Sequence, residues 1–303
     1  MRLLTRSDFD GIACAALLKE LGVIDHMEYA HPKDLQDGKI AVTKDDVLAN
    51  VPYVPGCGLW FDHHSSERER LALAGQYEGR SEQSPSAARV IYDYYDDPRL
   101  SKFDEMLEYV DRVDSADLSE EEILNPTGWV LLGFICDPRT GLGYHKSFTI
   151  SNLQLMKNLM EALRTQGIGE IMAGADIQER VKLYFENDAR CKEFLKTHTV
   201  VDGPVAITDA RGLTDLPPGN RFLIYSLFPD TNISIRLIDG RGKEFVAISV
   251  GYSVLNRTSL VDVGSLMLKY GGGGHRAVGT CQVPYADADR VLKELVEAIK
   301  AQG

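Results

Sequence analysis

Two carboxylates near the start of the chain could bind a metal ion. Asp8 and Asp10 lie in the stretch SDFDG, where a predicted strand ends and a helix begins. Ligands bind at the carboxyl ends of strands in open parallel sheets, so both carboxylates can point at one spot. Paired oxygen ligands of this kind suit Mg²⁺ or Mn²⁺. The alternative is that one of the two only caps the helix.

A second group combines an acid with two imidazoles. Asp62, His63 and His64 directly follow the apolar run GLWF. Such a group at the end of a buried strand is difficult to satisfy without a ligand. One imidazole could bind a metal while the other reaches a substrate, and mixed carboxylate and imidazole ligands favour Mn²⁺ over Mg²⁺, with Zn²⁺ and Fe²⁺ still open. The alternative is a surface turn with solvated histidines.

The third group is suited to an anion. The stretch YGGGGHRAVGTC contains Gly272, Gly273 and Gly274, whose backbone N–H groups can approach an anion closely. His275 and Arg276 follow directly and add side-chain donors and positive charge. A glycine run taken by itself is more often a flexible turn, so this motif gains its meaning from the other two.

The elements that must position the first two motifs alternate between strands and helices. Apolar runs typical of strands occur at 2–5, 26–32, 40–42, 47–54 and 58–61. Helical patterns occur at 12–22, 84–95, 103–118 and 128–137, with Ser84 as the expected N-cap of the second and Pro85 at its first position. This order predicts an α/β fold with a mainly parallel sheet covered on both faces.

The rest of the chain divides into a helical segment and a second strand-rich region. Helical spacing alone continues from 151 to about 195, and strand patterns return at 221–228, 232–239, 245–255 and 280–283 before a helix at 286–301. We expect three parts: a domain with the parallel sheet at 1–150, a helical connector at 151–196, and a smaller α/β domain with a mixed sheet at 197–303.

Composition narrows the class of protein. The chain of 303 residues has a formal net charge of -12, which disfavours non-specific binding to long duplex nucleic acid and to anionic membranes. Its five cysteines form no CxxC pair, and no apolar run of about 18 residues is present. We expect a cytoplasmic protein without a signal peptide or a membrane span.

In their order and spacing, SDFDG, FDHH and GGGGH resemble the DHH family of phosphoesterases with a C-terminal DHHA1 domain, over nearly the whole chain. The wider superfamily includes RecJ-type exonucleases, nano-RNA and pAp phosphatases, cyclic dinucleotide phosphodiesterases and, more remotely, exopolyphosphatases and class II pyrophosphatases. The resemblance implies Mn²⁺-dependent hydrolysis of a phosphoester or phosphoanhydride bond.

The resemblance also implies roles for individual residues. Asp8, Asp10 and His63 would bind metal, together with Asp114, which we prefer over Asp111 in the stretch YVDRVDSAD. The expected catalytic and substrate-binding residues would surround them: Asp62 orienting the motif, His64 and Arg276 facing the substrate phosphate, and Gly272, Gly273, Gly274, His275, Arg276, Asn256 and Arg257 binding the substrate.

Two positions depart from the family pattern. Many relatives have a histidine where this chain has Leu4, although RecJ-type members also lack it. The metal-bridging aspartate expected at the end of the next strand aligns with Asn50, and a neutral amide is a poorer bridge than a carboxylate. Asp45 and Asp46 could replace it, but both precede the strand. A site with one metal, a weakly bound second metal, or lost catalysis all remain open.

These observations predict a phosphoesterase that uses one or two Mn²⁺ ions, or Mg²⁺, on a short phosphate-rich substrate such as an oligonucleotide, a dinucleotide or pAp. An exopolyphosphatase is the alternative within the same class. The alternative from another class is a non-catalytic nucleotide- or polyphosphate-binding protein with a degenerate metal site.

Overall fold

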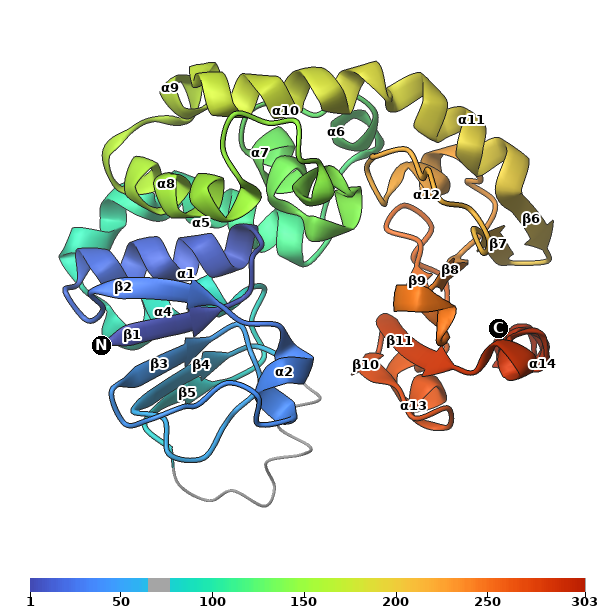
Figure 1. The fold of residues 1–303 in the computed structure, drawn as a ribbon, viewed down its shortest axis with the longest axis horizontal. Helices are drawn as coiled ribbons and strands as arrows, with labels where there is room; N and C mark the ends of the chain where they lie inside the picture. The colour runs from blue at the N-terminus through green and yellow to red at the C-terminus, as the bar shows by residue number, and fades with distance from the viewer. Residues whose placement is uncertain (65–76, 303) are drawn as a thin grey trace. The chain divides into compact units, whose positions relative to one another are not determined.

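The computed structural model describes residues 1–64 and 77–302, and the chain divides into two compact units (Figure 1). The first unit contains Met1–Asp117 and Pro126–Tyr184, and the second contains Leu118–Asn125 and Phe185–Gly303. Among the described residues, none of the helices combines the length and apolar character that crossing a bilayer requires.

The first unit is built on a five-stranded sheet whose strand order is β2-β1-β3-β4-β5, with all neighbours parallel. The strands are β1 (Arg2–Thr5), β2 (His26–Tyr29), β3 (Asp46–Ala49), β4 (Leu59–Asp62) and β5 (Gly79–Ser81). The predicted α/β class with a parallel sheet is therefore confirmed. Because all strands run the same way, their carboxyl ends lie along one edge of the sheet.

Helix α1 (Phe9–Glu20) begins at this edge and is buried over most of its length. Its residues from Phe9 to Leu18 are all buried, and most are small or apolar, as a helix enclosed on every side requires. Contacts with α4 (Ala87–Tyr95), α5 (Asp104–Asp114) and α8 (Asn152–Thr165) enclose it. Gly22, with a φ of 75°, ends the helix in the left-handed conformation that glycine adopts without strain.

In the part of the chain that the structure describes, seven further helical elements belong to this unit in whole or in part. They are α2 (Pro32–Gln36), η1 (Pro98–Phe103), α7 (Gly128–Cys136), η2 (Pro138–Thr140), η3 (Leu142–Tyr144), α9 (Ile168–Ala173) and α10 (Ala175–Glu186). The last of these, α10, continues past Tyr184 into the second unit and is followed there by α11 (Asp188–His198). The long helical stretch expected after residue 151 is present as α8 to α11.

Two local predictions in the first unit are wrong. Residues 40–42 form no strand; Ile40 and Val42 pack from a loop against the apolar cluster that contains Leu48 and Trp60. The N-cap of α4 is Ser86 rather than Ser84, because the Ser86 hydroxyl accepts the hydrogen bond from the backbone N–H of Arg89. Burial of the apolar run, rather than strand pairing, accounts for the pattern at 40–42.

The second unit contains a six-stranded mixed sheet of order β10-β11-β9-β8-β7-β6. The strands are β6 (Thr199–Asp202), β7 (Val205–Asp209), β8 (Ile233–Asp239), β9 (Val246–Tyr252), β10 (Gly273–His275) and β11 (Val278–Val283). Only β7 and β8 pair in parallel, and the other neighbours are antiparallel. The turn η4 (Arg241–Lys243) joins β8 and β9 into an antiparallel hairpin.

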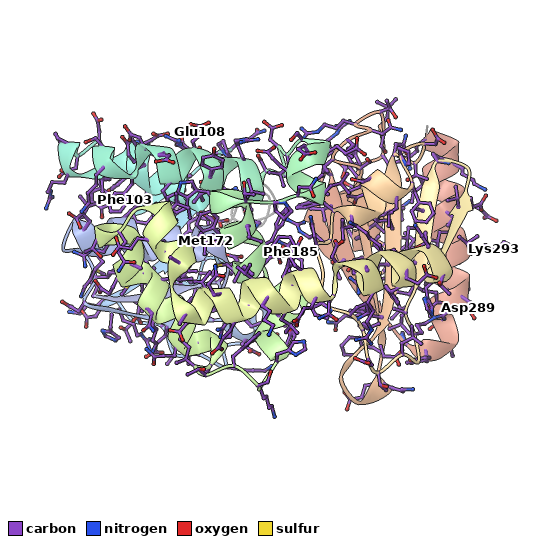
Figure 2. All side chains as sticks on the ribbon, turned by 90° about the horizontal axis from the view of Figure 1, so that it is seen from above. Phe103, Glu108, Met172, Phe185, Asp289 and Lys293 are labelled. Atoms are coloured by element: carbon purple, nitrogen blue, oxygen red, sulfur yellow. The ribbon has the colours of Figure 1, made fainter. Side chains whose placement is uncertain are left out.

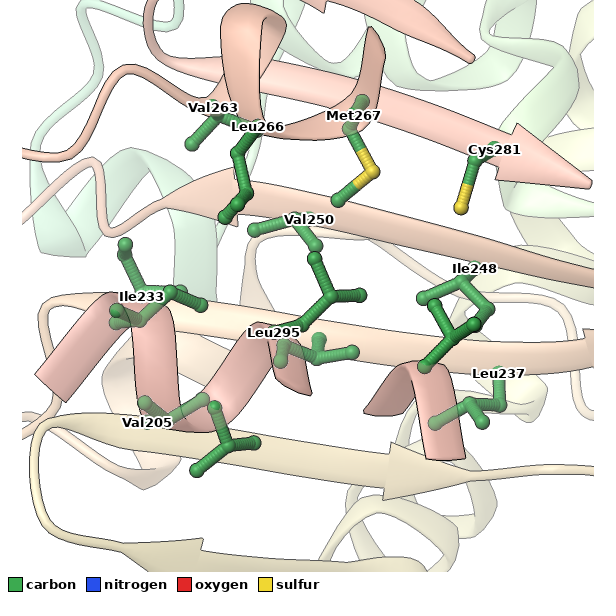
Figure 3. Packing of buried hydrophobic residues seen from close by; sticks show 14 of the residues in the cluster. Val205, Ile233, Leu237, Ile248, Val250, Val263, Leu266, Met267, Cys281 and Leu295 are labelled. Atoms are coloured by element: carbon green, nitrogen blue, oxygen red, sulfur yellow. The ribbon is translucent and has the colours of Figure 1, made fainter. Parts of the chain in front are cut away.

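One face of this sheet packs against two helices. Figure 3 shows Ile233, Leu237 and Ile248 from the strands facing Leu266 and Leu295, which come from α13 (Val263–Leu268) and α14 (Ala288–Gln302). The apolar residues alternate along β8 and β9, so their neighbours point to the opposite face. The polar side chains of that opposite face include Ser234, Arg236 and Ser249 beside small and apolar ones, and we call it the polar face.

The remaining elements of this unit are α6 (Glu120–Leu124), α12 (Leu223–Leu227) and η5 (Tyr285–Asp287). The strand predicted at 221–228 is wrong, because this apolar run forms α12. Its Leu223, Ile224 and Tyr225 are all buried. In so short an apolar run, the sequence pattern cannot distinguish a buried strand from a buried helical turn.

Candidate active site

The acidic and imidazole groups of the first unit follow the ends of neighbouring strands. Asp8 follows β1, Asn50 follows β3, and Asp62 is the last residue of β4. Since β1, β3 and β4 are adjacent and parallel, these positions meet at the carboxyl edge of the sheet. The sequence spacing thus translates into spatial proximity.

Asp8 is the N-cap of α1. Its Oδ1 accepts hydrogen bonds from the Gly11 N–H at 2.9 Å and from Asn50 Nδ2 at 3.0 Å, and its Oδ2 lies 3.2 Å from Arg6 Nε. A β-carbon at Gly11 would lie 2.1 Å from the Arg6 carbonyl oxygen, so only glycine fits where the helix starts this close to the strand. The helix-cap alternative for this motif therefore applies to Asp8.

Asp10 occupies the first turn of α1 and is completely enclosed. Its carboxylate accepts hydrogen bonds from the backbone N–H groups of Ala87 at 3.0 Å and Ala88 at 2.8 Å, at the start of α4. Burial raises the pKa of Asp10 well above its usual range, and the neighbouring carboxylate of Asp114 raises it further. A cation beside Asp10 would relieve both effects.

His63 and Asp114 complete a cluster around Asp10. The Nε2 atom of His63 lies 3.3 Å from Asp114 Oδ2 and 4.0 Å from Asp10 Oδ2. One potential ligand atom from each of the three residues lies within 4.8 Å of the other two. The Nδ1 atom of His63 is 3.1 Å from the Ser84 carbonyl oxygen, which can only accept, so Nδ1 donates to it and Nε2 is the ring nitrogen that faces the carboxylates. Two carboxylates and one imidazole nitrogen are a fitting ligand set for Mn²⁺ or a similar divalent ion.

Helix α5, which ends at Asp114, also carries Asp111, whose contacts are different. Its carboxylate accepts a hydrogen bond from the Ser86 hydroxyl at 2.7 Å and two from the Arg89 guanidinium, at 2.9 and 2.7 Å. These contacts join α5 to the start of α4. Asp114, one turn further along α5, instead faces His63. Of these two aspartates, Asp114 is therefore the one that lies beside His63 and Asp10.

Asp62 and His64 form a second pair beside the cluster. Asp62 is fully buried, and its Oδ1 lies 2.8 Å from His64 Nδ1 while its Oδ2 accepts from the His64 backbone N–H at 3.2 Å. Burial lowers the pKa of His64, but the charge and hydrogen bond of Asp62 outweigh this effect and raise the pKa above its usual value. Asp62 thus orients His64 and favours its charged form.

Asn50 lies at the position where a bridging carboxylate was expected. Its backbone has a φ of 57°, in the left-handed region that asparagine tolerates better than most residues. Its Nδ2 donates to Asp8, while its Oδ1 is buried and has no hydrogen-bond partner among the described residues. Asp46 cannot replace it, because Asp46 starts β3 and pairs there with Arg2.

The glycine stretch of the second unit forms strand β10 rather than an open loop. A β-carbon at Gly272 would lie 2.2 Å from the Thr280 carbonyl oxygen, and one at Gly274 would lie 2.1 Å from the Val278 carbonyl oxygen. Packing against β11 therefore requires glycine at these two positions, whereas a β-carbon at Gly273 would meet no atom within 4 Å. The side chain of His275 lies outside the part of the chain that the structure describes.

The other predicted substrate-binding residues lie on loops of the second unit. Arg276 is exposed at the turn between β10 and β11, and its carbonyl accepts from the Val263 N–H. Arg257 donates from Nε to the Val254 carbonyl at 3.0 Å, and Asn256 accepts from the Thr258 hydroxyl at 2.8 Å. These contacts fold the segment after β9 onto itself.

The sequence did not indicate which backbone groups complete the site of the first unit. The Ser84 carbonyl fixes the tautomer of His63, and the N–H groups of Ala87 and Ala88 hold Asp10. In the sequence, the only signal for these backbone groups was the helix start predicted at Ser84 and Pro85.

Comparison with solved structures finds proteins similar to this chain at both high and low identity. A pGpG-specific phosphodiesterase, PggH, from Vibrio cholerae is 42% identical, with a TM-score of 0.80 over 100% of this chain and 99% of that chain. An exopolyphosphatase-related protein from Bacteroides fragilis is 12% identical, with a TM-score of 0.51 over 99% of this chain and 91% of its own.

RecJ from Thermus thermophilus, solved in complex with Mn²⁺, is also 12% identical, with a TM-score of 0.51 over 99% of this chain and 52% of that chain. The two distant proteins show a shared fold. No family model matches the chain, and no curated protein matches it.

Proposed function

Since the chain belongs to the DHH/DHHA1 family of phosphoesterases, we propose that it hydrolyses the linear dinucleotide pGpG to two molecules of GMP with the help of a divalent cation. The observation that carries this proposal is the 42% identity to a pGpG-specific phosphodiesterase, which extends over the full length of the chain. The acidic net charge of -12 agrees with a short substrate rather than a long nucleic acid.

Asp10, His63 and Asp114 would hold the cation, for which we propose Mn²⁺ with Mg²⁺ as a substitute. A cation bound there supplies a Lewis acid that lowers the pKa of water and offsets charge on the phosphate. The buried Oδ1 of Asn50, which has no hydrogen-bond partner among the described residues, is available as a further neutral ligand. Asp8 is already held by three donors, so we propose that the second ion of the site binds weakly.

The remaining side chains act on the substrate. Asp62 holds His64 through Nδ1, so Nε2 is the atom that would meet the phosphate and donate a hydrogen bond to it. We assign Arg276 and the stretch Gly272–His275 of the second unit to binding the dinucleotide, with Asn256 and Arg257 beside them. These assignments are supported by the motif positions and by the exposure of Arg276.

The test is release of GMP from pGpG by the full-length protein with Mn²⁺, next to pAp, a five-nucleotide RNA and inorganic polyphosphate. We expect rapid turnover of pGpG that His63→Ala lowers by about a thousandfold or more. The matched control His145→Ala, at an exposed position of the same unit, should retain full activity.

Other outcomes would replace the proposal. Release of phosphate from polyphosphate without turnover of pGpG would identify an exopolyphosphatase. Tight binding of pGpG without turnover at saturating Mn²⁺ would identify a non-catalytic binding protein, and would agree with the neutral Asn50 at the bridging position.

A further inference from the structure

The polar face of the six-stranded sheet carries an arginine that has no counter-ion among the described residues. Arg236 lies in β8 between Ile235 and Leu237, whose side chains belong to the apolar core on the other face. Its own side chain therefore points to the polar face. Within the described ranges, the Nε atom of Arg236 is buried without a hydrogen-bond partner, and the guanidinium forms no ion pair with a carboxylate.

The surroundings of Arg236 do not compensate its charge. Burial lowers the pKa of Arg236, and the group that acts on it electrostatically is the Cys191 thiol of α11. Burial raises the pKa of Cys191 to about 11, so this thiol is neutral at physiological pH. A largely buried guanidinium beside a neutral thiol costs stability unless an anion joins it.

Hydroxyl groups extend from Arg236 in both directions across the sheet. Thr208 on β7 and Ser249 on β9 are its register partners, and Thr280 on β11 is the register partner of Ser249. The row ends at Gly273, which pairs with Thr280 at the start of the glycine motif. The Thr208 hydroxyl lies 2.8 Å from that of Thr199, and the Ser249 hydroxyl lies 3.4 Å from that of Thr280. In each pair the hydroxyl that accepts keeps its own proton for an anion, so the row can provide a neutral donor on both sides of the guanidinium.

The residues over this face leave part of it open. Tyr225 of α12 covers one end, where its hydroxyl lies 2.9 Å from the Ser234 hydroxyl. Thr208 is buried, whereas Ser249 is half-buried and Thr280 is exposed. An anion can thus reach Arg236 from the side of β9 and β11.

We propose that Arg236 binds a phosphate group on the polar face of the second unit, with the hydroxyls of Ser249 and Thr208 as additional donors. The planar guanidinium presents two parallel N–H groups that match two phosphate oxygens. The assignment of this group to the substrate rests on the proposed function, because pGpG contains both a terminal phosphate and a phosphodiester. The anion site itself does not depend on it.

The first test measures thermal unfolding of the full-length protein without added metal, with increasing inorganic phosphate. We expect phosphate to raise the melting temperature of the wild type, because a ligand of the folded state stabilises it. Arg236→Met should lose this response. Lys293→Met removes the same charge from the exposed side of α14 and should respond like the wild type (Figure 2).

The variants also separate a binding role from a structural one. Without phosphate, Arg236→Met should melt at or above the wild-type temperature, because an uncompensated buried charge has been removed. Arg236→Lys keeps the charge without the two-pronged geometry and should bind phosphate several-fold more weakly than the wild type. An equal phosphate response in Arg236→Met, or a much lower melting temperature of that variant without phosphate, would overturn the proposal.

The second test uses pGpG and Mn²⁺. We expect Arg236→Met to raise KM about tenfold or more with a smaller change in kcat, as loss of a charged hydrogen bond predicts. An unchanged KM in an active enzyme would overturn the assignment to the substrate. If the wild type does not hydrolyse pGpG while its phosphate response still requires Arg236, the anion site stands and the proposed function fails.

Discussion

The two sheets of this protein differ in the sign of the unbalanced charge that they carry. At the carboxyl edge of the parallel sheet, Asp10 and Asp114 gather around His63 and leave an excess of negative charge. On the polar face of the mixed sheet, Arg236 leaves an excess of positive charge. Half-buried charges such as Asp111 and Arg89 instead pair with each other within the protein. Charge left without a protein partner therefore marks the positions where a ligand of opposite sign is expected.

Among the variants, Asp10→Asn should have the largest effect on activity. A small effect would contradict the comparison between the two sheets. The amide keeps the shape of the carboxylate but removes its charge. We therefore expect the protein to lose Mn²⁺ and its activity to fall by at least about a thousandfold. Metal content and pGpG hydrolysis are measured together. Asp111→Asn is the matched control: it removes a carboxylate that already has partners, and should lower thermal stability while activity falls less than about tenfold.

Asp62→Asn tests a carboxylate that orients His64 and does not itself bind the metal. We expect kcat to fall about 10- to 100-fold, because His64 loses the carboxylate that fixes its orientation and favours its charged form. The Mn²⁺ content should stay at the wild-type level. Loss of metal together with activity would show that Asp62 is itself part of the metal site.

Asp46→Asn sharpens the comparison at the amino end of β3, where a charge has a protein partner. Burial alone raises the pKa of Asp46, but hydrogen bonds from Arg2 and Thr43 outweigh it and hold the pKa below its usual range. A carboxyl with a lowered folded pKa contributes stability above its unfolded pKa of about 3.9, and this contribution is lost as pH falls through the folded pKa.

The free energy of unfolding of Asp46→Asn should therefore be about 1.5–3 kcal/mol lower than that of the wild type at pH 7. The difference should shrink progressively below about pH 4 as the wild-type carboxylate is protonated. Urea unfolding at pH 7 and at pH 3 measures it. A difference that stays constant over this range would contradict the role assigned to the charge.

Glu20→Gln should have the smallest effect. Glu20 joins α1 to η1 and α8 through Lys102 at 2.8 Å and Arg164 at 3.1 Å, and these hydrogen bonds lower its pKa. Because such pairs lie near solvent, we expect a loss of less than about 1 kcal/mol that added salt reduces further. A loss several times larger, insensitive to salt, would show that this network is more important than the geometry suggests.

The sequence was sufficient to predict the fold class and the strand ends that converge. The motifs SDFDG and FDHH indicated where two strands end, because a carboxylate or imidazole after an apolar run can be recognised in the sequence. The sequence could not separate Asp111 from Asp114 by physics, since the distinction depends on Arg89 from another helix. Nor could it indicate Arg236, because the proposed anion site depends on the lack of a neighbouring carboxylate among the residues that the structure describes.

Short apolar runs were the other source of error. The stretch at 221–228 reads equally well as a strand or as a helix, and packing alone makes it α12. The N-cap of α4 is Ser86 rather than Ser84 because the Ser86 hydroxyl accepts from the Arg89 N–H, and both serines are good caps by residue type alone.

The most direct measurement is anomalous X-ray scattering from crystals of the full-length protein grown with Mn²⁺. The account predicts a peak bound by Asp10, His63 Nε2 and Asp114, with a weaker second peak or none on the side of Asp8 and Asn50. Absence of a peak at this cluster in protein that hydrolyses pGpG, or a peak bound by other residues alone, would contradict the assignment of the metal centre.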